Sequence, residues 1–596
     1  MNKKEKMSFK VLWPFVRRYK KIFIRMIIFG ILVTTFDSIY PLFNRYAINH
    51  FIGEGTVDTL AVFIALFGAV ILAQSVVDYF NVNDCAKMEM YMDRDLRNSA
   101  FSHLQTVSMS YFNQNNVGYI HARVMSDSGK IGEMIAWRMM DIVWGGSYIL
   151  QSLIVITFIN FRLALILLAV IPFALLIIIL FQKKLKKLNH GVREQNARIT
   201  ADINEGITGV KTIRTLAIED KKQNEFYGET LIMRRLSVRT SHYSALFAAV
   251  IGLISALALG AVIWSGGEMT KEDIIGLGTL SVFMSYALNM LEPIQNIVNA
   301  ISGVVAIRVN VERYMGLMNT TGEVFDSEEV IEKYGDAFNE KRENWESLTG
   351  DIEFENVTFK YPDGDETVLE DFNLKVPRGT MTAIVGETGA GKSTLVNLVC
   401  RFFEPTKGRV LLDGRDIKER SLSWLHSNLG YVLQTAHLFS GTIRENLKYG
   451  NPDATDEEIL KVLENVAPGF AEKKLKKGLD TAVEEGGDNF SAGEKQLLSI
   501  ARALLADPRI LILDEATAAI DSVTEKTIQE AIKTAIKGRT SFVIAHRLST
   551  IVNADLIILV NEGRIVESGS HAELMRKKGE YYKLYTRQYE AISVDM

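Results

Sequence analysis

Residues 386–394 read GETGAGKST and have the spacing of a phosphate-binding loop, in which two glycines separated by four residues precede a lysine and a hydroxyl residue. The mostly apolar residues 380–385 predict a strand, and the residues from Lys392 onward predict a helix. Backbone N–H groups at a helix N-terminus can bind phosphate oxygens. We expect Lys392 to contact the β- and γ-phosphates and the Ser393 hydroxyl to bind Mg²⁺. The predicted nucleotide-binding residues of this loop are Gly386, Glu387, Thr388, Gly389, Ala390, Gly391, Lys392, Ser393 and Thr394.

A second motif, RILILDE at residues 509–515, runs from four apolar residues into two carboxylates. Asp514 suits coordination of Mg²⁺, directly or through water. Glu515 could accept a proton from an attacking water or hold that water in line. The alternative is an acidic strand end that caps the following helix, and the presence of the phosphate loop favours the catalytic interpretation.

Three polar residues follow other apolar strands. Tyr361 could stack on an adenine ring, Gln434 could bind Mg²⁺ or the attacking water, and His546 could contact the γ-phosphate. Each residue alone could equally belong to ordinary packing. Their order and spacing around the phosphate loop favour nucleotide chemistry.

Together, residues 351–575 resemble the ATPase domain of an ATP-binding cassette (ABC) transporter. GETGAGKST resembles the Walker A motif and ILILDE the Walker B motif. Residues 518–521, which include Asp521, match the D-loop, although they read AAID where the family usually has SALD. The resemblance implies ATP and Mg²⁺ as cofactors. It also assigns A-, Q- and H-loop roles to Tyr361, Gln434 and His546, catalysis to Glu515, His546 and Gln434, and Mg²⁺ coordination to Ser393, Gln434 and Asp514.

The signature motif of the family, LSGGQ, is altered to FSAGE at residues 490–494. Ser491 and Gly493 keep a hydroxyl and a bare backbone N–H at a helix start. Ala492 adds a Cβ where the backbone must approach phosphate closely, a position suited to glycine. Glu494 replaces a neutral amide with an acid, whose charge Lys495 could partly offset.

The altered signature raises the question of a second, different chain. In the family, two half-transporters bind each ATP between the Walker motifs of one chain and the signature helix of the other. Glu515, Gln434 and His546 match the family here, while the signature differs from LSGGQ. This combination resembles one half of a heterodimeric exporter with one degenerate ATP site. The alternative is a homodimer with two equal sites, in which alanine is small enough and Glu494 points away.

Composition bounds the class of protein. A chain of 596 residues predicts two to four domains, and a net charge of −4 does not indicate a nucleic-acid partner. Two distant cysteines exclude a disulfide framework. The N-terminus has basic residues but no small-residue cleavage site after a short apolar run, so we expect no removable signal peptide.

Six apolar runs in the first half are long enough to cross a bilayer. Lys and Arg gather before the first run and within 182–242, which predicts that both termini and the ATPase domain are cytoplasmic, in a multi-pass plasma-membrane protein. Residues 8–21 mix aromatic and basic residues and predict an interfacial helix. The predicted spans are residues 22–40, 60–77, 139–159, 163–181, 243–264 and 274–298.

The predicted fold class is an all-α transmembrane domain of six helices, with the exporter (type IV) fold that the resemblance implies, fused to a C-terminal α/β P-loop ATPase domain. We expect the membrane domain at 1–319, a polar linker at 320–350 and the ATPase domain at 351–596. Two long cytoplasmic connections should turn near 113–119 and 205–210. The resemblance implies that these turns are coupling helices that contact the ATPase domains.

Polar residues inside membrane spans are costly and often functional. Asp37, Asp141, Asn289 and Glu292 are therefore candidates for the substrate pathway, although helix–helix hydrogen bonding could also explain each one. The predicted function is ATP-driven export of drugs or other amphipathic molecules by alternating access. A dedicated peptide or lipid exporter is the alternative, and the lack of a peptidase domain before the spans weakens its leader-cleaving version. A nucleotide-gated channel or regulatory subunit is disfavoured, because Glu515 is intact.

Overall fold

The computed structural model describes residues 12–320, 322–514, 522–544 and 551–594. They form two compact units, which are described separately. The first contains the residues up to His103 together with Gly118–Asn319. The second contains Leu104–Val117 together with the residues from Thr320.

The first unit is helical, and six of its helices in the described part of the chain are long and apolar enough to cross a membrane. This confirms the six predicted spans. Short helix α1 (Trp13–Arg18) lies inside the predicted interfacial segment. The spanning segments are Lys20–Gly53, Leu60–Leu104, Val117–Ile159, Phe161–Thr208, Glu219–Lys271 and Leu277–Met318.

Several of these segments consist of more than one helical element. The first comprises α2 (Lys20–Tyr46) and a π-helical turn, Ala47–Gly53. The third comprises α5 (Val117–His121), α6 (Ser128–Glu133) and α7 (Met139–Ile159), joined by π-helical turns at Ala122–Asp127 and Met134–Arg138. The others are α3 (Leu60–Leu104), α8 (Phe161–Thr208), α10 (Glu219–Lys271), and α11 (Leu277–Asn289) followed by α12 (Leu291–Met318).

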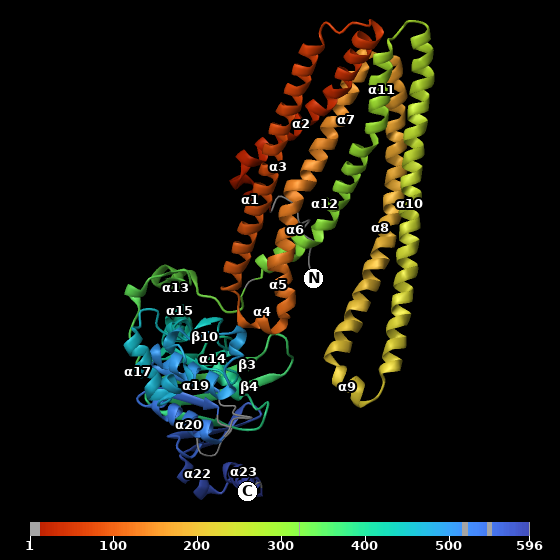
Figure 1. The fold of residues 1–596 in the computed structure, drawn as a ribbon. Coiled ribbons are helices and arrows are strands. Elements are labelled where there is room, and N and C mark those ends of the chain that lie inside the picture. Colours follow the sequence, from red (N-terminus) through yellow and green to blue (C-terminus); the bar gives the residue numbers. More distant parts are fainter. Residues whose placement is uncertain (1–11, 321, 515–521, 545–550, 595–596) are drawn as a thin grey trace. The chain divides into compact units, whose positions relative to one another are not determined.

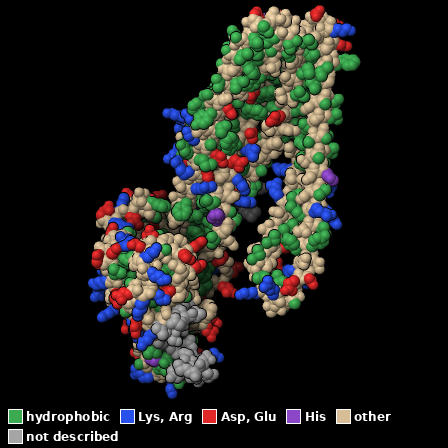
Figure 2. All heavy atoms as spheres, in the orientation of Figure 1, with side chains coloured by type: hydrophobic (Ala, Val, Ile, Leu, Met, Phe, Trp, Pro, Cys, Tyr) green, Lys and Arg blue, Asp and Glu red, His purple; other side chains and the backbone are tan. Residues whose placement is uncertain are grey.

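Close helix packing holds this unit together. Helix α2 packs against α7 and α11, and α7 also packs against α12. A Cβ at Gly145 of α7 would lie 3.0 Å from the Pro293 carbonyl oxygen of α12, so glycine permits that close approach. The Tyr286 hydroxyl of α11 donates a 2.5 Å hydrogen bond to the Ser38 carbonyl of α2. In Figure 2 hydrophobic side chains cover much of the visible face of these helices.

Two pairs of helices extend well beyond the predicted spans, as their helix-forming composition indicates. Helices α8 and α10 run side by side and are joined by short helix α9 (Val210–Thr215), where the second turn is predicted (Figure 1). Helix α3 ends at Leu104, and short helix α4 (Met109–Gln114) then begins the turn that is predicted near 113–119.

The second unit has the predicted α/β architecture. A six-stranded sheet has the order β14-β13-β5-β12-β11-β8, and a four-stranded antiparallel sheet has the order β4-β3-β6-β7. The first sheet contains β14 (Arg564–Gly569), β13 (Leu556–Asn561), β5 (Met381–Val385), β12 (Thr540–Ile544), β11 (Ile510–Asp514) and β8 (Leu429–Val432). The second contains β4 (Thr367–Val376), β3 (Ile352–Lys360), β6 (Lys407–Leu412) and β7 (Arg415–Asp416).

Successive side chains of the central strands point to opposite faces of the six-stranded sheet and form a hydrophobic core on each face. Ala383 and Val385 belong to one cluster, and Ile384 between them belongs to the other. Both faces are covered, which explains why β5 and β12 are buried at every residue. The longer helices of this unit are α14 (Lys392–Val399), α17 (Asp456–Val466), α19 (Ala492–Leu505), α20 (Ser522–Ile536) and α23 (Glu580–Val594).

The segment predicted as a linker, 320–350, is folded against this unit in its described residues. It contains α13 (Glu328–Tyr334) and a two-stranded hairpin of β1 (Gly335–Asp336) and β2 (Asn339–Glu340). The buried guanidinium of Arg401 forms a 2.8 Å ion pair with Asp326. The Trp424 indole N–H donates a 2.8 Å hydrogen bond to the Glu346 carbonyl.

Candidate functional site

Parallel strand pairing brings the predicted nucleotide residues to one edge of the six-stranded sheet. Strand β12 pairs in parallel with both β5 and β11, and β11 pairs in parallel with β8. Asp514 is registered opposite Ile544, which is registered opposite Ile384, two residues before Gly386. The phosphate loop, Asp514 and the exposed Gln434 therefore all follow the carboxyl ends of parallel strands, where ligands of such sheets bind.

The glycines of the phosphate loop are required by its geometry. A Cβ at Gly386 would lie 2.2 Å from the Val560 carbonyl oxygen. Gly391 is the N-cap of α14 and has a φ of 102°, a left-handed conformation that favours glycine. The loop thus leads from the buried strand β5 to the N-terminus of α14.

Lys392 lies within the loop rather than in solvent. Its ammonium donates hydrogen bonds of 2.5 and 2.9 Å to the carbonyl oxygens of Gly386 and Glu387. Burial lowers the pKa of Lys392, and the Asp514 carboxylate opposes this effect. A buried ammonium held by neutral carbonyls can be attracted to an incoming phosphate.

Tyr361 stands directly after β3 and is fixed by three neighbours. Its hydroxyl lies 3.0 Å from the Thr394 hydroxyl. Its ring makes T-shaped contacts with Phe359 and Phe403, at centroid distances of 4.8 and 5.1 Å. The ring is thus held in place beside α14, as the proposed stacking on a base requires.

Tyr361 also lines a hollow of about 660 Å³, which sequence reasoning did not predict. Residues of α4 line the same hollow, whereas the resemblance implied only that the turn near 113–119 is a coupling helix that contacts the ATPase domains. The lining residues are Ser110, Asn113, Gln114, Tyr361, Asp363, Gly364, Asp365, Glu366, Val368, Asn397 and Phe403.

The altered signature begins helix α19 with a capping box. The Glu494 N–H donates to the Ser491 hydroxyl oxygen at 3.3 Å, and the Glu494 carboxylate accepts from the Ser491 N–H at 2.9 Å. Lys474, at the end of short helix α18 (Phe470–Lys474), lies 2.7 Å from the same carboxylate. Ser491 and Ala492 are exposed, whereas Gly493 is buried.

The counter-charge of Glu494 differs from the one suggested by the sequence. Lys495 instead donates a 2.8 Å hydrogen bond to the Gly486 carbonyl and lies 3.6 Å from Asp488. Burial by itself raises the pKa of Glu494, but Lys474 and the Ser491 N–H outweigh it, so the net pKa is lowered. The carboxylate is therefore ionised, paired and turned back onto its own helix.

Three predicted functional residues, Glu515, Asp521 and His546, lie outside the residues that the structure describes. Their proposed roles remain predictions. Ser393 is described and is exposed at the start of α14, so its hydroxyl is accessible to a ligand.

Within the membrane helices, three of the four candidate pathway residues line one cavity of about 320 Å³. They are Asp37, Asn289 and Glu292, and aromatic side chains of Tyr40, Trp144 and Tyr148 join them. Asp37 also accepts a 2.8 Å hydrogen bond from Gln74.

Asp141 is not among the residues that line this cavity. Its carboxylate instead lies 3.3 Å from Arg138, three residues before it on the same helical segment. The sequence did not predict that Trp144 and Tyr148, one and two helical turns further on, would contribute to the cavity.

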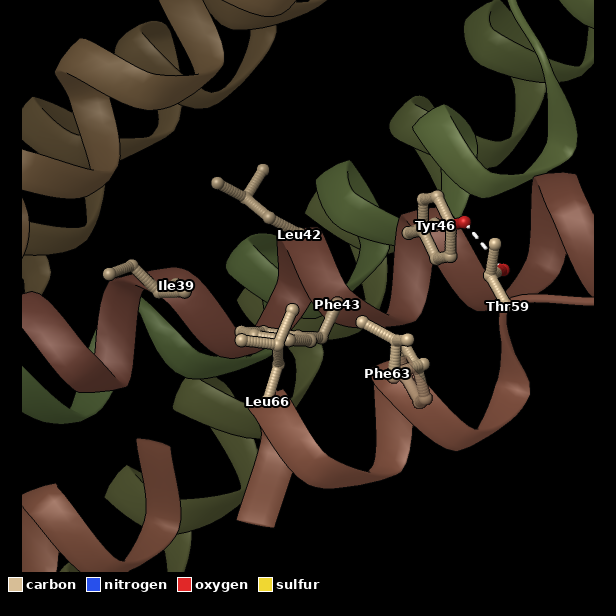
Figure 3. Close-up of a pocket in the computed structure, with 8 residues that line it drawn as sticks. Ile39, Leu42, Phe43, Tyr46, Thr59, Phe63 and Leu66 are labelled. Atoms are coloured by element: carbon tan, nitrogen blue, oxygen red, sulfur yellow. Dashed lines mark hydrogen bonds between the residues drawn. The ribbon is translucent and has the colours of Figure 1, made fainter. Parts of the chain in front are cut away.

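A second, apolar pocket of about 350 Å³ lies between α2 and α3 (Figure 3). Figure 3 shows the aromatic rings of Phe43 and Phe63 in this pocket and the 2.8 Å hydrogen bond between the hydroxyl groups of Tyr46 and Thr59 at one end. We call the cavity lined by Asp37 and Glu292 the acidic cavity. The α2 residues that line the apolar pocket alternate along the helix with the α2 residues that line the acidic cavity, so the two hollows adjoin different faces of α2. The pocket lining comprises Ile39, Leu42, Phe43, Tyr46, Thr59, Val62, Phe63 and Leu66.

Comparison with known proteins gives matches over both units. Residues 23–294 match the family described as the ABC transporter transmembrane region, and residues 369–518 match the family described as ABC transporter. The ABC transporter ATP-binding protein YfiC of Bacillus subtilis, which is uncharacterized, is 32% identical over 99% of this chain and 95% of its own length.

Two further relatives have names that describe transport. The probable multidrug resistance ABC transporter ATP-binding/permease protein YheH of Bacillus subtilis is 35% identical over 83% of this chain and 72% of its own length. The ATP-dependent lipid A-core flippase of Desulfotalea psychrophila is 33% identical over 83% of this chain and 84% of its own length.

Proposed function

This chain belongs to the ABC transporter family, and we propose that it exports amphipathic organic cations as one half of a dimeric transporter. It is a multi-pass plasma-membrane protein with a cytoplasmic ATPase domain, and hydrolysis of ATP by that domain is coupled to transport. Three points are proposals: the substrate, the identity of the second chain and the roles of individual residues.

The proposed ATP site comprises the phosphate loop, Tyr361, Asp514 and Gln434, with Glu515 and His546 acting on the γ-phosphate and its attacking water. The residues fit Mg²⁺, because the exposed hydroxyl of Ser393 and the carboxylate of Asp514 are hard oxygen ligands. Ser393 comes after β5 and Asp514 ends β11, and both strands pair in parallel with β12. Mg²⁺ bound there would neutralise charge on the phosphates. Glu515→Gln should abolish ATP turnover while ATP binding persists, and continued turnover would contradict the role of Glu515.

ABC exporters work as dimers, and exposed apolar side chains on the cytoplasmic parts of α8 and α10, and just after α9, support a second chain here. Ile207, Leu216 and Tyr227 have exposed fractions of 69%, 61% and 62%. Apolar side chains on a cytoplasmic arm have no lipid to cover them, so contact with a protein partner would remove them from water.

We propose that the partner is a different half-transporter. The support now rests mainly on Ala492, whose Cβ is exposed at the start of α19, where the signature of one chain faces ATP bound to the other. Glu494 contributes less than the sequence alone suggested, because its carboxylate is paired with Lys474. Purified alone, this chain should have low ATP turnover; a fully active homodimer would overturn the proposal.

The acidic cavity carries the proposal of a cationic substrate. Two carboxylates, Asp37 and Glu292, line it together with Trp144 and Tyr148. Carboxylates attract a cation directly, and aromatic faces attract it through their negative quadrupole. The apolar pocket on another face of α2 suits the hydrophobic part of an amphipathic molecule.

Efflux assays can test this substrate class with a matched control. Asp37→Asn and Glu292→Gln should reduce efflux of a cationic dye about tenfold, while efflux of a neutral dye of similar size stays nearly unchanged. Asp141→Asn is the control, because that carboxylate pairs with Arg138 outside the cavity lining. Equal loss for both dyes, or an equal effect of Asp141→Asn, would contradict a cation site.

A lipid exporter is the second candidate, and the identity to a lipid A-core flippase favours it. Reconstitution into vesicles with fluorescent lipids separates the two possibilities. Lipid translocation that depends on ATP and is unaffected by Asp37→Asn would favour the lipid function.

A further inference from the structure

We infer that helix α4 forms one wall of the pocket for the nucleobase, so that the connection between the second and third spans contacts the adenine of bound ATP. This inference rests on the proposed nucleotide site. It adds two specific residues, Asn113 and Gln114, whose side-chain amides line the hollow beside Tyr361.

The hollow is large enough to hold a nucleobase. Its volume of about 660 Å³ lies within the usual range for small-molecule sites. Its lining includes Tyr361, Val368 and Phe403, which present aromatic and apolar surface. Asn113 and Gln114 of α4 line the same hollow, so a flat heterocycle would find stacking surface and polar groups in one place.

Helix α4 is held in the same compact unit as the sheet. Its Ser110 and Tyr111 side chains are buried, with exposed fractions of 7% each. The Ser108 hydroxyl, just before the helix, accepts a 3.4 Å hydrogen bond from the Glu323 N–H. Asn113 and Gln114 on the same helix are exposed, and their side chains are therefore accessible to a ligand.

Charge determines which end of the nucleotide can occupy this hollow. Asp363, Asp365 and Glu366 line it, and its lining contains no Lys or Arg among the described residues. A triphosphate would be repelled there, whereas Lys392, which donates to the carbonyl oxygens of the phosphate loop, is not among the lining residues. The neutral base is the part of ATP that this end can accept.

The chemistry of the amides suits adenine. The base presents an N–H₂ donor beside ring-nitrogen acceptors, and Asn and Gln each offer both a donor and an acceptor that match this pattern. Because ADP carries the same base, it should contact α4 as ATP does, while inorganic tripolyphosphate should not. Base contact and phosphate contact can therefore be separated experimentally.

The first test measures binding to the assembled transporter in lipid nanodiscs, by displacement of a fluorescent ATP analogue. The Asn113→Ala/Gln114→Ala double variant should bind ADP and ATP about tenfold more weakly, and should bind tripolyphosphate as the unaltered chain does. Asn116→Ala removes an amide from the adjoining turn that does not line the hollow, and it should bind ADP normally. Unchanged ADP binding by the double variant, or an equal loss of tripolyphosphate binding, would overturn the inference.

A second test detects contact between α4 and the base without measuring nucleotide affinity. The two natural cysteines, Cys85 and Cys400, are both buried, so Gln114→Cys would introduce an accessible thiol. ADP should slow its reaction with a maleimide, and tripolyphosphate should not. Labelling of Gln114→Cys at the same rate with and without saturating ADP would contradict contact between α4 and the base.

A wrong assignment of the ATP site itself would give a different pattern of binding. Lys392→Ala should weaken binding of both ATP and tripolyphosphate, because it removes the phosphate-binding ammonium. If Lys392→Ala binds both normally, the nucleotide site is wrong. If it loses both while the α4 variants behave as the unaltered chain, the site is right and only the role of α4 is wrong.

Discussion

The hydroxyl groups of Tyr361 and Thr394 lie 3.0 Å apart, so the residue after β3 is joined directly to the helix that follows the phosphate loop. Thr394 is buried. The proposed base-stacking ring and the proposed phosphate loop are therefore one connected structure.

Tyr361→Phe should distinguish the contribution of the Tyr361 hydroxyl from that of its ring. Loss of one hydrogen bond should lower the free energy of unfolding by about 1 kcal/mol, while stacking on the base is kept. Tyr361→Ala should in addition weaken ATP binding about tenfold, because base–aromatic stacking is worth about 1–3 kcal/mol. Thermal unfolding and binding of a fluorescent ATP analogue measure the two effects. Equal ATP affinities for the two variants would exclude stacking on Tyr361.

Gly386→Ala should damage ATP binding through a backbone clash. Its Cβ would lie 2.2 Å from the Val560 carbonyl oxygen, so the start of the loop must move. We expect ATP affinity to fall at least about tenfold, which corresponds to about 1.4 kcal/mol. Gly414→Ala is the control, because it has a φ of 73° and open space around its Cβ but lies outside the loop. It should cost about 1 kcal/mol of stability and leave ATP binding intact.

Arg401→Met should strongly destabilise the second unit. The guanidinium is 2% exposed and pairs with Asp326 and Glu404, at 2.8 and 3.1 Å. Removing one partner of a buried ion pair costs about 3–5 kcal/mol. Arg409→Met is the matched control, because its 2.6 Å pair with Glu355 is at the surface, where solvent screens the charges, and its loss should change stability little. Similar melting temperatures for the two variants would show that Arg401 is not a structural anchor.

Asp413 should give the second unit a pH-dependent stability. Burial alone raises the pKa of Asp413, but the Thr349 hydroxyl and the backbone N–H groups of Thr349, Asp351 and Gly350 outweigh it and lower the net pKa. A lowered folded-state pKa means that this stability is fully present above about pH 4 and is lost as the pH falls through the folded-state value.

Asp413→Asn should therefore lower the free energy of unfolding at pH 7 by about 1.5–3 kcal/mol. The difference from the unaltered chain should shrink at lower pH. Fluorescence of Trp424, which is buried in this unit, can follow unfolding. A difference that stays constant down to pH 3 would contradict the role of the ionised carboxylate.

Glu494→Gln should be nearly neutral, because glutamine can also accept the hydrogen bond from the Ser491 N–H. Only the pair with the exposed Lys474 is lost, which is worth at most about 1 kcal/mol. Ala492→Gly should instead raise ATP turnover of the assembled transporter, because it removes the Cβ from the surface that is proposed to face the partner's ATP. ATPase rates measure both changes. A larger effect of Glu494→Gln than of Ala492→Gly would reverse their proposed importance.

Local patterns in the sequence predicted the elements of the fold, and the chemistry assigned to their residues remains a prediction. The apolar runs predicted six spans, and the strand–loop–helix pattern around Lys392 predicted the phosphate loop. The gathering of Gly386, Asp514 and Gln434 at one edge follows from the parallel pairing of strands that each end in a polar residue.

Contacts between distant elements could not be predicted in this way. Lys495 was suggested as the counter-charge of Glu494, but adjacent residues point away from each other on a helix, and Lys474 arrives from another element. Asp141 and Trp144 both lie on α7, and only the packing of α7 against α2 and α12 decides which of them borders the cavity. The position of α4 beside Tyr361 likewise depends on tertiary folding.

The capping box at Ser491 and Glu494 bears on how such a chain can evolve. Glutamate and glutamine both close this box, so an ancestor could exchange one for the other without a penalty in folding. In the proposed heterodimer, the two genes could therefore diverge at the signature while each product remains folded. Neutral drift at this position could come before any division of labour between two ATP sites.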